Sequence, residues 1–115
     1  KGVPNKGYLE MKALLSKPEP PTAVFCVSDR SAFGALSAIS EAGLRVPEDI
    51  ALIGFDDVPE SLHSNPPLST VHLPKWEMGV EAARRLAKVI HQSPSDGNTP
   101  VKITVPTFLV VRAST

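Results

Sequence analysis

The sequence predicts an α/β protein built on a parallel sheet. Two short apolar runs, residues 22–27 and 50–55, predict buried strands, and a helical pattern of apolar residues separates them. Strand, helix and strand in this order imply parallel pairing with a right-handed crossover. Doubly wound sheets usually have about five or six strands. Two clear strands and a few weaker candidates therefore predict a partial doubly wound sheet, the later portion of a larger architecture.

The chain begins with a predicted helix and strand. Residues 6–16 are expected to be helical because Tyr8, Met11 and Leu15 fall on one stripe, and the prolines from residue 18 onward end the helix. Residues 22–27 form a continuous apolar run, a pattern typical of a central parallel strand covered on both faces. The single cysteine, Cys26, lies in this run and is expected to be a small buried core residue.

A second helix is predicted after residue 28. The apolar positions of its buried stripe are Ala32, Ala35, Leu36 and Ile39. Gly43 is expected to end it in a left-handed conformation. Ser28 and Asp29 are both favourable N-cap residues, and Asp29 is the expected cap.

The second strand, residues 50–55, stops at two adjacent carboxylates, Asp56 and Asp57. A short helix is expected at 59–64, with Asp57 as its candidate cap, and a brief strand follows at 69–73. Residues 75–92 predict the longest helix, whose apolar face is broad enough to need a partner on more than one side. The end of the chain, 101–115, predicts terminal strands or one bent strand interrupted at Pro106.

Charge limits the classes of function. Twelve acidic residues balance twelve Lys and Arg, so the chain lacks the positive field of a free-standing nucleic-acid binder. A small-molecule binder or an enzyme fits this balance better. No apolar stretch approaches the ~20 residues of a membrane span.

Polar residues follow both predicted parallel strands, where ligands bind in open α/β sheets. One strand end delivers Ser28, Asp29 and Arg30, and the other delivers Asp56 and Asp57. Asp56 is the strongest candidate, because a carboxylate there accepts hydrogen bonds from sugar hydroxyls or a purine N–H. A metal site is not expected, since adjacent aspartates in extended chain point to opposite faces and no calcium-loop spacing is present. Neither a nucleophile elbow nor a Gly-rich phosphate loop occurs.

Residues 21–90 match, in order and spacing, a family pattern that includes "VPEDI", "GFDD" and "PPLST". The chain resembles the C-terminal part of the LacI/GalR (lactose-repressor) family of transcription regulators. The resemblance implies a periplasmic-binding-protein-like, two-lobed core that binds an effector between its lobes. It makes residues 1–115 the C-terminal portion of the effector-binding and dimerisation domain. Residues 69–92 would cross to a first lobe outside this sequence and leave the apolar face of the long helix exposed here or covered by another copy.

The resemblance also assigns residues. Asp56 matches a ligand-contacting aspartate, and Ser28 stands where the family usually has a ligand-contacting asparagine. Asp29 matches the adjacent acid, which looks like a helix cap in the family. The strand-end position, and not the resemblance, adds Asp29 and Arg30 to the expected ligand residues. Residues matching surfaces that join subunits in the family's homodimers are Tyr8, Phe33, Leu62 and His63. Leu73 replaces a common glutamine near the crossover between lobes.

Three functions are weighed. The first is the effector-sensing and dimerisation portion of a cytoplasmic transcription repressor, without cofactor or metal, reaching operator DNA only through a helix-turn-helix outside these residues. The second is a periplasmic solute-binding protein of the same fold. The third is a small enzyme using the Asp56–Asp57 pair, and no second catalytic group accompanies that pair in the sequence. The motifs "VPEDI", "GFDD" and "PPLST" favour the regulator over the other two functions.

Overall fold

A computed structural model describes residues 5–91 and 102–115 of the chain. The chain divides into two compact units, each with its own elements: Lys1–His72 with Phe108–Thr115, and Leu73–Thr107. No helix of the described residues is both long and apolar enough to cross a membrane.

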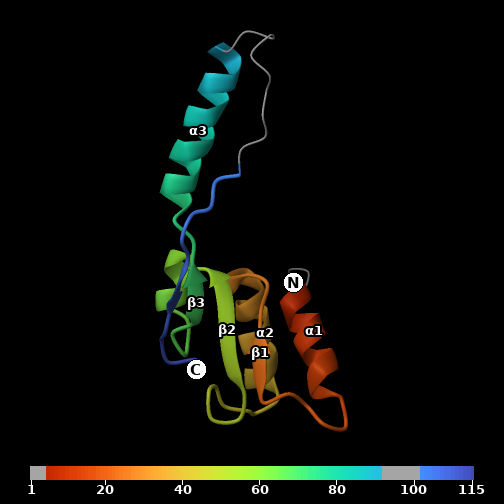
Figure 1. Ribbon diagram of the computed structural model, residues 1–115. Coiled ribbons are helices and arrows are strands. Elements are labelled where there is room, and N and C mark those ends of the chain that lie inside the picture. Colours follow the sequence, from red (N-terminus) through yellow and green to blue (C-terminus); the bar gives the residue numbers. More distant parts are fainter. Residues whose placement is uncertain (1–4, 92–101) are drawn as a thin grey trace. The chain divides into compact units, whose positions relative to one another are not determined.

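The first unit contains a four-stranded mixed sheet in the order β1-β2-β3-β4 (Figure 1). The strands are β1 (Ala23–Phe25), β2 (Ala51–Asp56), β3 (Ser69–His72) and β4 (Phe108–Val110). The first three are parallel, and β4 runs antiparallel to β3. The predicted α/β class, the parallel pairing and the brief strand near residues 69–73 are confirmed.

The register brings three residues to one end of the sheet. Asp56 of β2 pairs with His72 of β3, and His72 pairs in turn with Phe108 of β4. His72 also stacks on the Phe108 ring, with centroids 4.6 Å apart. The carboxyl end of β2 therefore lies beside the residues at which the chain leaves the first unit and returns to it.

Two helices accompany this sheet: α1 (Lys6–Leu15) packs on α2 (Asp29–Glu41), and α2 packs on β2. The helix α1 begins at Asn5, whose side chain accepts a 2.8 Å hydrogen bond from the Gly7 amide. At the end of α2, Gly43 has φ +72° as predicted. Its amide binds the Ser40 carbonyl and the Leu44 amide binds the Ile39 carbonyl, which closes the helix with a Schellman motif.

The core lies on one face of the sheet. Its buried apolar residues are Met11, Cys26, Ala32, Ala35, Ala38, Ile39, Ile50, Leu52 and Leu68. Burial, with smaller contributions from Glu10 and Asp29, raises the pKa of the Cys26 thiol to about 11. Cys26 is thus the small core residue that the sequence predicts.

The prediction of β1 as a central strand is wrong. Among the described strands, β1 lies at the edge of the sheet, and Phe25 is 59% exposed. Along β2, buried Leu52 and Gly54 alternate with half-buried neighbours. Such alternation is typical of a sheet covered more fully on one face. A continuous apolar run reports the composition of a strand but not the number of its neighbours.

The second unit contains α3 (Lys75–His91), in the place predicted for the longest helix. None of its residues is buried, and Trp76, Leu86 and Ile90 are 80%, 61% and 68% exposed. The apolar face is exposed, as predicted. Residues 102–107 form no strand, so the predicted terminal strands reduce to β4. The last residue of the predicted long helix, 92, and the first residue of the predicted terminal strands, 101, lie outside the described residues.

Candidate functional site

The candidate site lies where β1 and β2 end. These strands are parallel neighbours, with Phe25 opposite Ile53, so the carboxyl ends of both strands lie at the same end of the sheet. A 2.9 Å hydrogen bond from the Val58 amide to Asp29 Oδ2 joins the two loops directly. The predicted proximity of the two loops is confirmed.

Ser28 is the N-cap of α2. It is half-buried, has an extended backbone (φ −158°), and its Oγ accepts a 3.2 Å bond from the Ser31 amide. The same hydroxyl donates to Ser31 Oγ at 3.2 Å. The prediction that Asp29 caps this helix is therefore wrong, because Asp29 is the first helical residue and its side chain turns into the protein.

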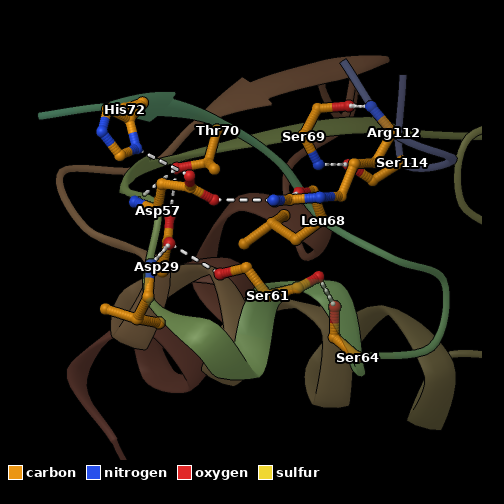
Figure 2. Close-up of polar contacts among 11 residues, drawn as sticks. Asp29, Asp57, Ser61, Ser64, Leu68, Ser69, Thr70, His72, Arg112 and Ser114 are labelled. Carbon is orange, nitrogen blue, oxygen red and sulfur yellow. Dashed lines mark hydrogen bonds and ion pairs between the residues drawn. The ribbon is translucent and has the colours of Figure 1, made fainter. Parts of the chain in front are cut away.

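Asp29 is fully buried, and its carboxylate accepts three hydrogen bonds (Figure 2). Besides the Val58 amide, Ser61 Oγ donates at 2.6 Å and Thr70 Oγ1 at 2.5 Å. Such bonds are what make a buried charge tolerable. The prediction of Asp29 as a ligand contact is corrected, because this carboxylate reaches no surface.

The adjacent aspartates occupy a turn of unusual backbone geometry. Asp56 has φ 114° and Asp57 has φ 51°, values in the left-handed region that favours glycine. Each such residue costs on the order of 1–3 kcal/mol and persists only where its surroundings hold it. Conformations of this kind concentrate at functional sites. Asp56 and Asp57 lie at the carboxyl end of β2, where the sequence predicts the ligand.

Asp57 is engaged inside the first unit (Figure 2). Its Oδ1 accepts from Arg112 Nη2 at 2.7 Å, and its Oδ2 lies 2.8 Å from His72 Nδ1. Burial alone would raise the pKa of the Asp57 carboxyl, but the hydrogen bonds and charges of Arg112 and His72 outweigh it, so the pKa lies below its usual range.

Asp57 does not cap the following short helix, contrary to prediction. The N-cap of that helix, η1 (Pro59–Leu62), is Val58, without a side-chain bond. The carboxylate of Asp57 is used by Arg112 and His72 instead. For the same reason, Asp57 is not poised as the second group of an acid–base pair with Asp56.

The C-terminal residues complete this network, which sequence reasoning missed. Arg112 Nη1 donates to the Leu68 carbonyl at 2.7 Å, and the Arg112 amide donates to Ser69 Oγ at 2.8 Å. Asp57 follows β2 and Arg112 follows β4, and these two strands lie on opposite sides of β3. Only the pairing of β3 with β4 brings these residues together, and no local motif signals that pairing.

Three of the predicted ligand residues therefore remain at one place: Ser28, Arg30 and Asp56, here termed the strand-end edge. Asp56 is half-buried at the end of β2, and Arg30 is exposed in the first turn of α2. The Arg30 carbonyl accepts a bond from Asn5 Nδ2, which ties this turn to α1. The side chains of the strand-end edge carry a carboxylate, a hydroxyl and a guanidinium, which are groups that form hydrogen bonds.

A second surface lies between α2 and η1. A hollow of about 760 Å³, here termed the α2–η1 groove, is lined by Phe33, Leu36, Ser37, Ser40, Pro59, Glu60, His63, Ser64 and Asn65. Leu62, the chain neighbour of the groove residue His63, is 57% exposed. Ser37 also lines a smaller hollow containing Tyr8. Of the residues expected to join subunits, Phe33 and His63 line the groove and Tyr8 lines the smaller hollow. The groove contains no residue of the strand-end edge.

Among residues 5–91 and 102–115, no three His, Cys, Asp or Glu side chains are grouped as a metal site requires.

Comparison with known proteins identifies the family of this fold. Residues 3–115 match the family described as a periplasmic binding protein-like domain. The HTH-type transcriptional repressor PurR of Haemophilus influenzae (strain PittEE) is 40% identical over 111 residues, which are 96% of this chain and 33% of that protein. PurR of Escherichia coli O139:H28 (strain E24377A / ETEC) is 48% identical over 83 residues, 72% of this chain and 24% of that protein. The chain spans about a third or less of these relatives.

Solved structures give the same result. The transcriptional regulator CelR–cellobiose complex superposes with a TM-score of 0.85 and 37% identity, over 95% of this chain and 32% of that one. The lac repressor dimer bound to operator and the anti-inducer ONPF superposes with a TM-score of 0.81 and 33% identity, over 95% of this chain and 37% of that one. These matches confirm the resemblance seen in the motifs. The chain belongs to the periplasmic binding protein-like domain family, in the form carried by LacI-type transcriptional regulators.

Proposed function

We propose that the chain is the effector-sensing and dimerisation portion of a LacI-type transcription regulator. The observation that carries the proposal is the position of Asp56. It ends β2 at the strand-end edge, beside the parallel strand β1 that leads into Ser28–Arg30, and the Val58 amide joins the two loops by its bond to Asp29. In open α/β sheets this edge is where ligands bind.

The proposed ligand is a small polar molecule, sugar-like or purine-like. Asp56 accepts hydrogen bonds from its hydroxyl or N–H groups, and Ser28 and Arg30 contribute from the neighbouring loop. Two structural relatives support this class, since one holds cellobiose and the other the anti-inducer ONPF. Ligand groups on the opposite side would come from a first lobe outside these 115 residues, and closure between lobes would shift a pre-existing equilibrium.

Operator binding belongs to the whole regulator and not to this chain alone. The net charge of zero gives these residues no positive field for DNA. A helix-turn-helix segment outside them would make the contact, since the PurR relatives are HTH-type transcriptional repressors. Such a regulator works in the cytoplasm. The alternative, a periplasmic solute-binding protein, is less well supported because the relatives named above are regulators.

Calorimetry on the intact regulator tests the effector site. A thermal-shift panel of sugars and purines, including cellobiose, selects the ligand for titration. Asp56→Ala is expected to weaken binding at least about tenfold, because a charged hydrogen bond is lost. Glu48→Ala is the matched control, since Glu48 is an exposed carboxylate before the opposite end of β2. An unchanged dissociation constant in Asp56→Ala removes Asp56 from the site.

We propose that the α2–η1 groove is where a second copy of the chain docks. Phe33 and Leu36 supply apolar area and His63 and Glu60 supply a polar wall, a composition typical of interfaces between subunits. The structural relative that binds operator is described as a dimer. Sedimentation of the intact protein should show that Leu62→Glu shifts dimer to monomer, whereas Leu9→Glu, at a similar 53% exposure on α1, does not. Equal sedimentation of both variants would place the interface elsewhere.

A further inference from the structure

A fully buried carboxylate lies between the strand-end edge and the α2–η1 groove. Ser28, directly before Asp29, belongs to the edge, and Phe33, one helical turn after it, lines the groove. The side chain of Asp29 is 0% exposed. Because a buried charge is costly unless its oxygens are bound, the donors around Asp29 show what this charge holds in place.

One donor comes from the wall of the groove. Ser61 Oγ donates to Asp29 Oδ2 at 2.6 Å, and Ser61 itself is fully buried inside η1. Pro59, Glu60 and His63, which lie within two positions of Ser61 in the chain, line the groove. The helix η1 is a single short turn without a side-chain cap. The bond to Asp29 therefore fixes this wall against α2, which forms the opposite wall.

The other two donors hold the turn behind the strand-end edge. The Val58 amide donates to Asp29 Oδ2 at 2.9 Å. Thr70 Oγ1 donates to Asp29 Oδ1 at 2.5 Å and accepts from the Asp57 amide at 3.3 Å. The chain of bonds from Asp57 through Thr70 to Asp29 secures the residues that follow Asp56, whose backbone is left-handed.

The β2 backbone also leaves room for this carboxylate. A Cβ at Gly54 would overlap Asp29 Oδ1 and press on Leu68. Gly54 has no positive φ, so the absence of a side chain there is explained by the Asp29 carboxylate and not by backbone conformation. The position of the carboxylate is therefore fixed by close packing as well as by its three bonds.

We propose that Asp29 is a positioning residue that fixes the strand-end edge and the α2–η1 groove in one arrangement. All three of its neighbours donate, so an asparagine amide at this position would face at least one donor with its own N–H groups. The roles of the strand-end edge and the α2–η1 groove rest on the proposed function. The three hydrogen bonds from Val58, Ser61 and Thr70 to Asp29, here termed the Asp29 junction, do not rest on it.

Hydrogen exchange at single-amide resolution in the intact, ligand-free protein tests the proposal. The amides of Asp57 and Val58 report on the turn, and those of Ser61 and His63, which bond to Val58 and Glu60 carbonyls, report on η1. Asp29→Asn is expected to accelerate exchange at both places by about tenfold or more, since a charged hydrogen bond is lost at each.

Two further variants each remove one hydroxyl donor of the Asp29 junction. They test η1 and the turn after Asp56 separately. Ser61→Ala should accelerate exchange in η1 and leave the turn unchanged, and Thr70→Val should accelerate exchange at Asp57 and leave η1 unchanged. Met11→Ala is the control for general destabilisation, because it removes a fully buried core side chain of α1 and none of the donors to Asp29. It should raise exchange across the first unit without this selectivity. If Asp29→Asn raises exchange at Asp57 and Ser61 no more than at core amides such as Leu52, Asp29 is a stability residue only and the proposal is overturned.

Sedimentation connects the junction to self-association. Asp29→Asn and Ser61→Ala should weaken the dimer, and Met11→Ala should not, when all are measured well below their unfolding temperatures. A wild-type protein that stays monomeric would refute the docking of a second copy. The exchange pattern would still decide whether Asp29 holds both surfaces, so the two failures are distinguishable.

Discussion

The Asp57 carboxylate and the Arg112 guanidinium lie 2.7 Å apart, and both side chains are only 16% exposed. Arg112 stands 55 positions further along the chain, after the segment of the second unit. The ion pair therefore joins the turn after β2 to the returning C-terminal residues. Asp56, the chain neighbour of Asp57, ends β2 at the strand-end edge.

This ion pair predicts acid sensitivity. Because the folded-state pKa of Asp57 is lowered, its contribution to the free energy of unfolding is present above the unfolded pKa of about 3.9 and is lost as pH falls through the lower folded value. Asp57→Asn should lower the free energy of unfolding at pH 7 by about 1.5–3 kcal/mol, as expected when charged hydrogen bonds are lost. Denaturant titrations from pH 7 down to acid should show a flatter dependence in the variant. An identical slope in both proteins would contradict the pairing.

Two glycines give a matched pair of substitutions. Gly54→Ala should destabilise the protein by about 1–3 kcal/mol, because the new methyl group overlaps the Asp29 carboxylate in a packed interior. Gly79→Ala adds the same atom in α3, where nothing lies within 4 Å of it, and should be neutral or stabilising by up to about 1 kcal/mol. Thermal unfolding of both variants beside the wild type measures the difference. Equal effects would mean that Asp29 does not lie over Gly54.

Local chemistry made several elements predictable. The end of α2 follows from Gly43, which adopts the left-handed conformation that helices commonly use to close. The stripe through Ala32 and Ile39 correctly predicts the buried face of that helix. The parallel order of β1 and β2 follows from the helix between them, and with it the meeting of the Ser28 and Asp56 loops.

The roles of the acids depended on distant partners that no local pattern reveals. Sequence neighbours predict helix caps for Asp29 and Asp57, but the structure pairs Asp29 with Ser61 and Thr70, 32 and 41 positions away. Asp57 likewise finds Arg112 through the pairing of β3 with β4. A cap residue and a buried hub residue have the same local sequence, and only the register of the sheet distinguishes them.

The cap of α2 can be separated from ligand contact at the same residue. Ser28→Ala removes the bond to the Ser31 amide and should cost about 1 kcal/mol of stability. Ser28→Asn should retain the cap, because asparagine is an equally good capping residue, and it adds an amide donor at the strand-end edge. Its effector affinity in calorimetry should therefore rise or hold while its unfolding temperature stays near wild type. Ser37→Ala, which removes a hydroxyl that bonds to the Phe33 carbonyl within α2, is the control.

The last prediction concerns α3, whose segment we propose to pack on a first lobe in the intact regulator. Trp76 is the single tryptophan of these 115 residues and is 80% exposed. An exposed indole emits at long wavelength and is readily quenched by iodide, and large apolar residues exposed together are typical of surfaces that another body covers. Emission from the 115-residue chain should therefore be red-shifted and quenchable. In the intact protein the Trp76 contribution, taken as the difference from a Trp76→Phe variant, should be blue-shifted and protected. If that difference spectrum remains red-shifted and open to iodide, the start of α3 does not pack on a first lobe, and the segment must serve another partner.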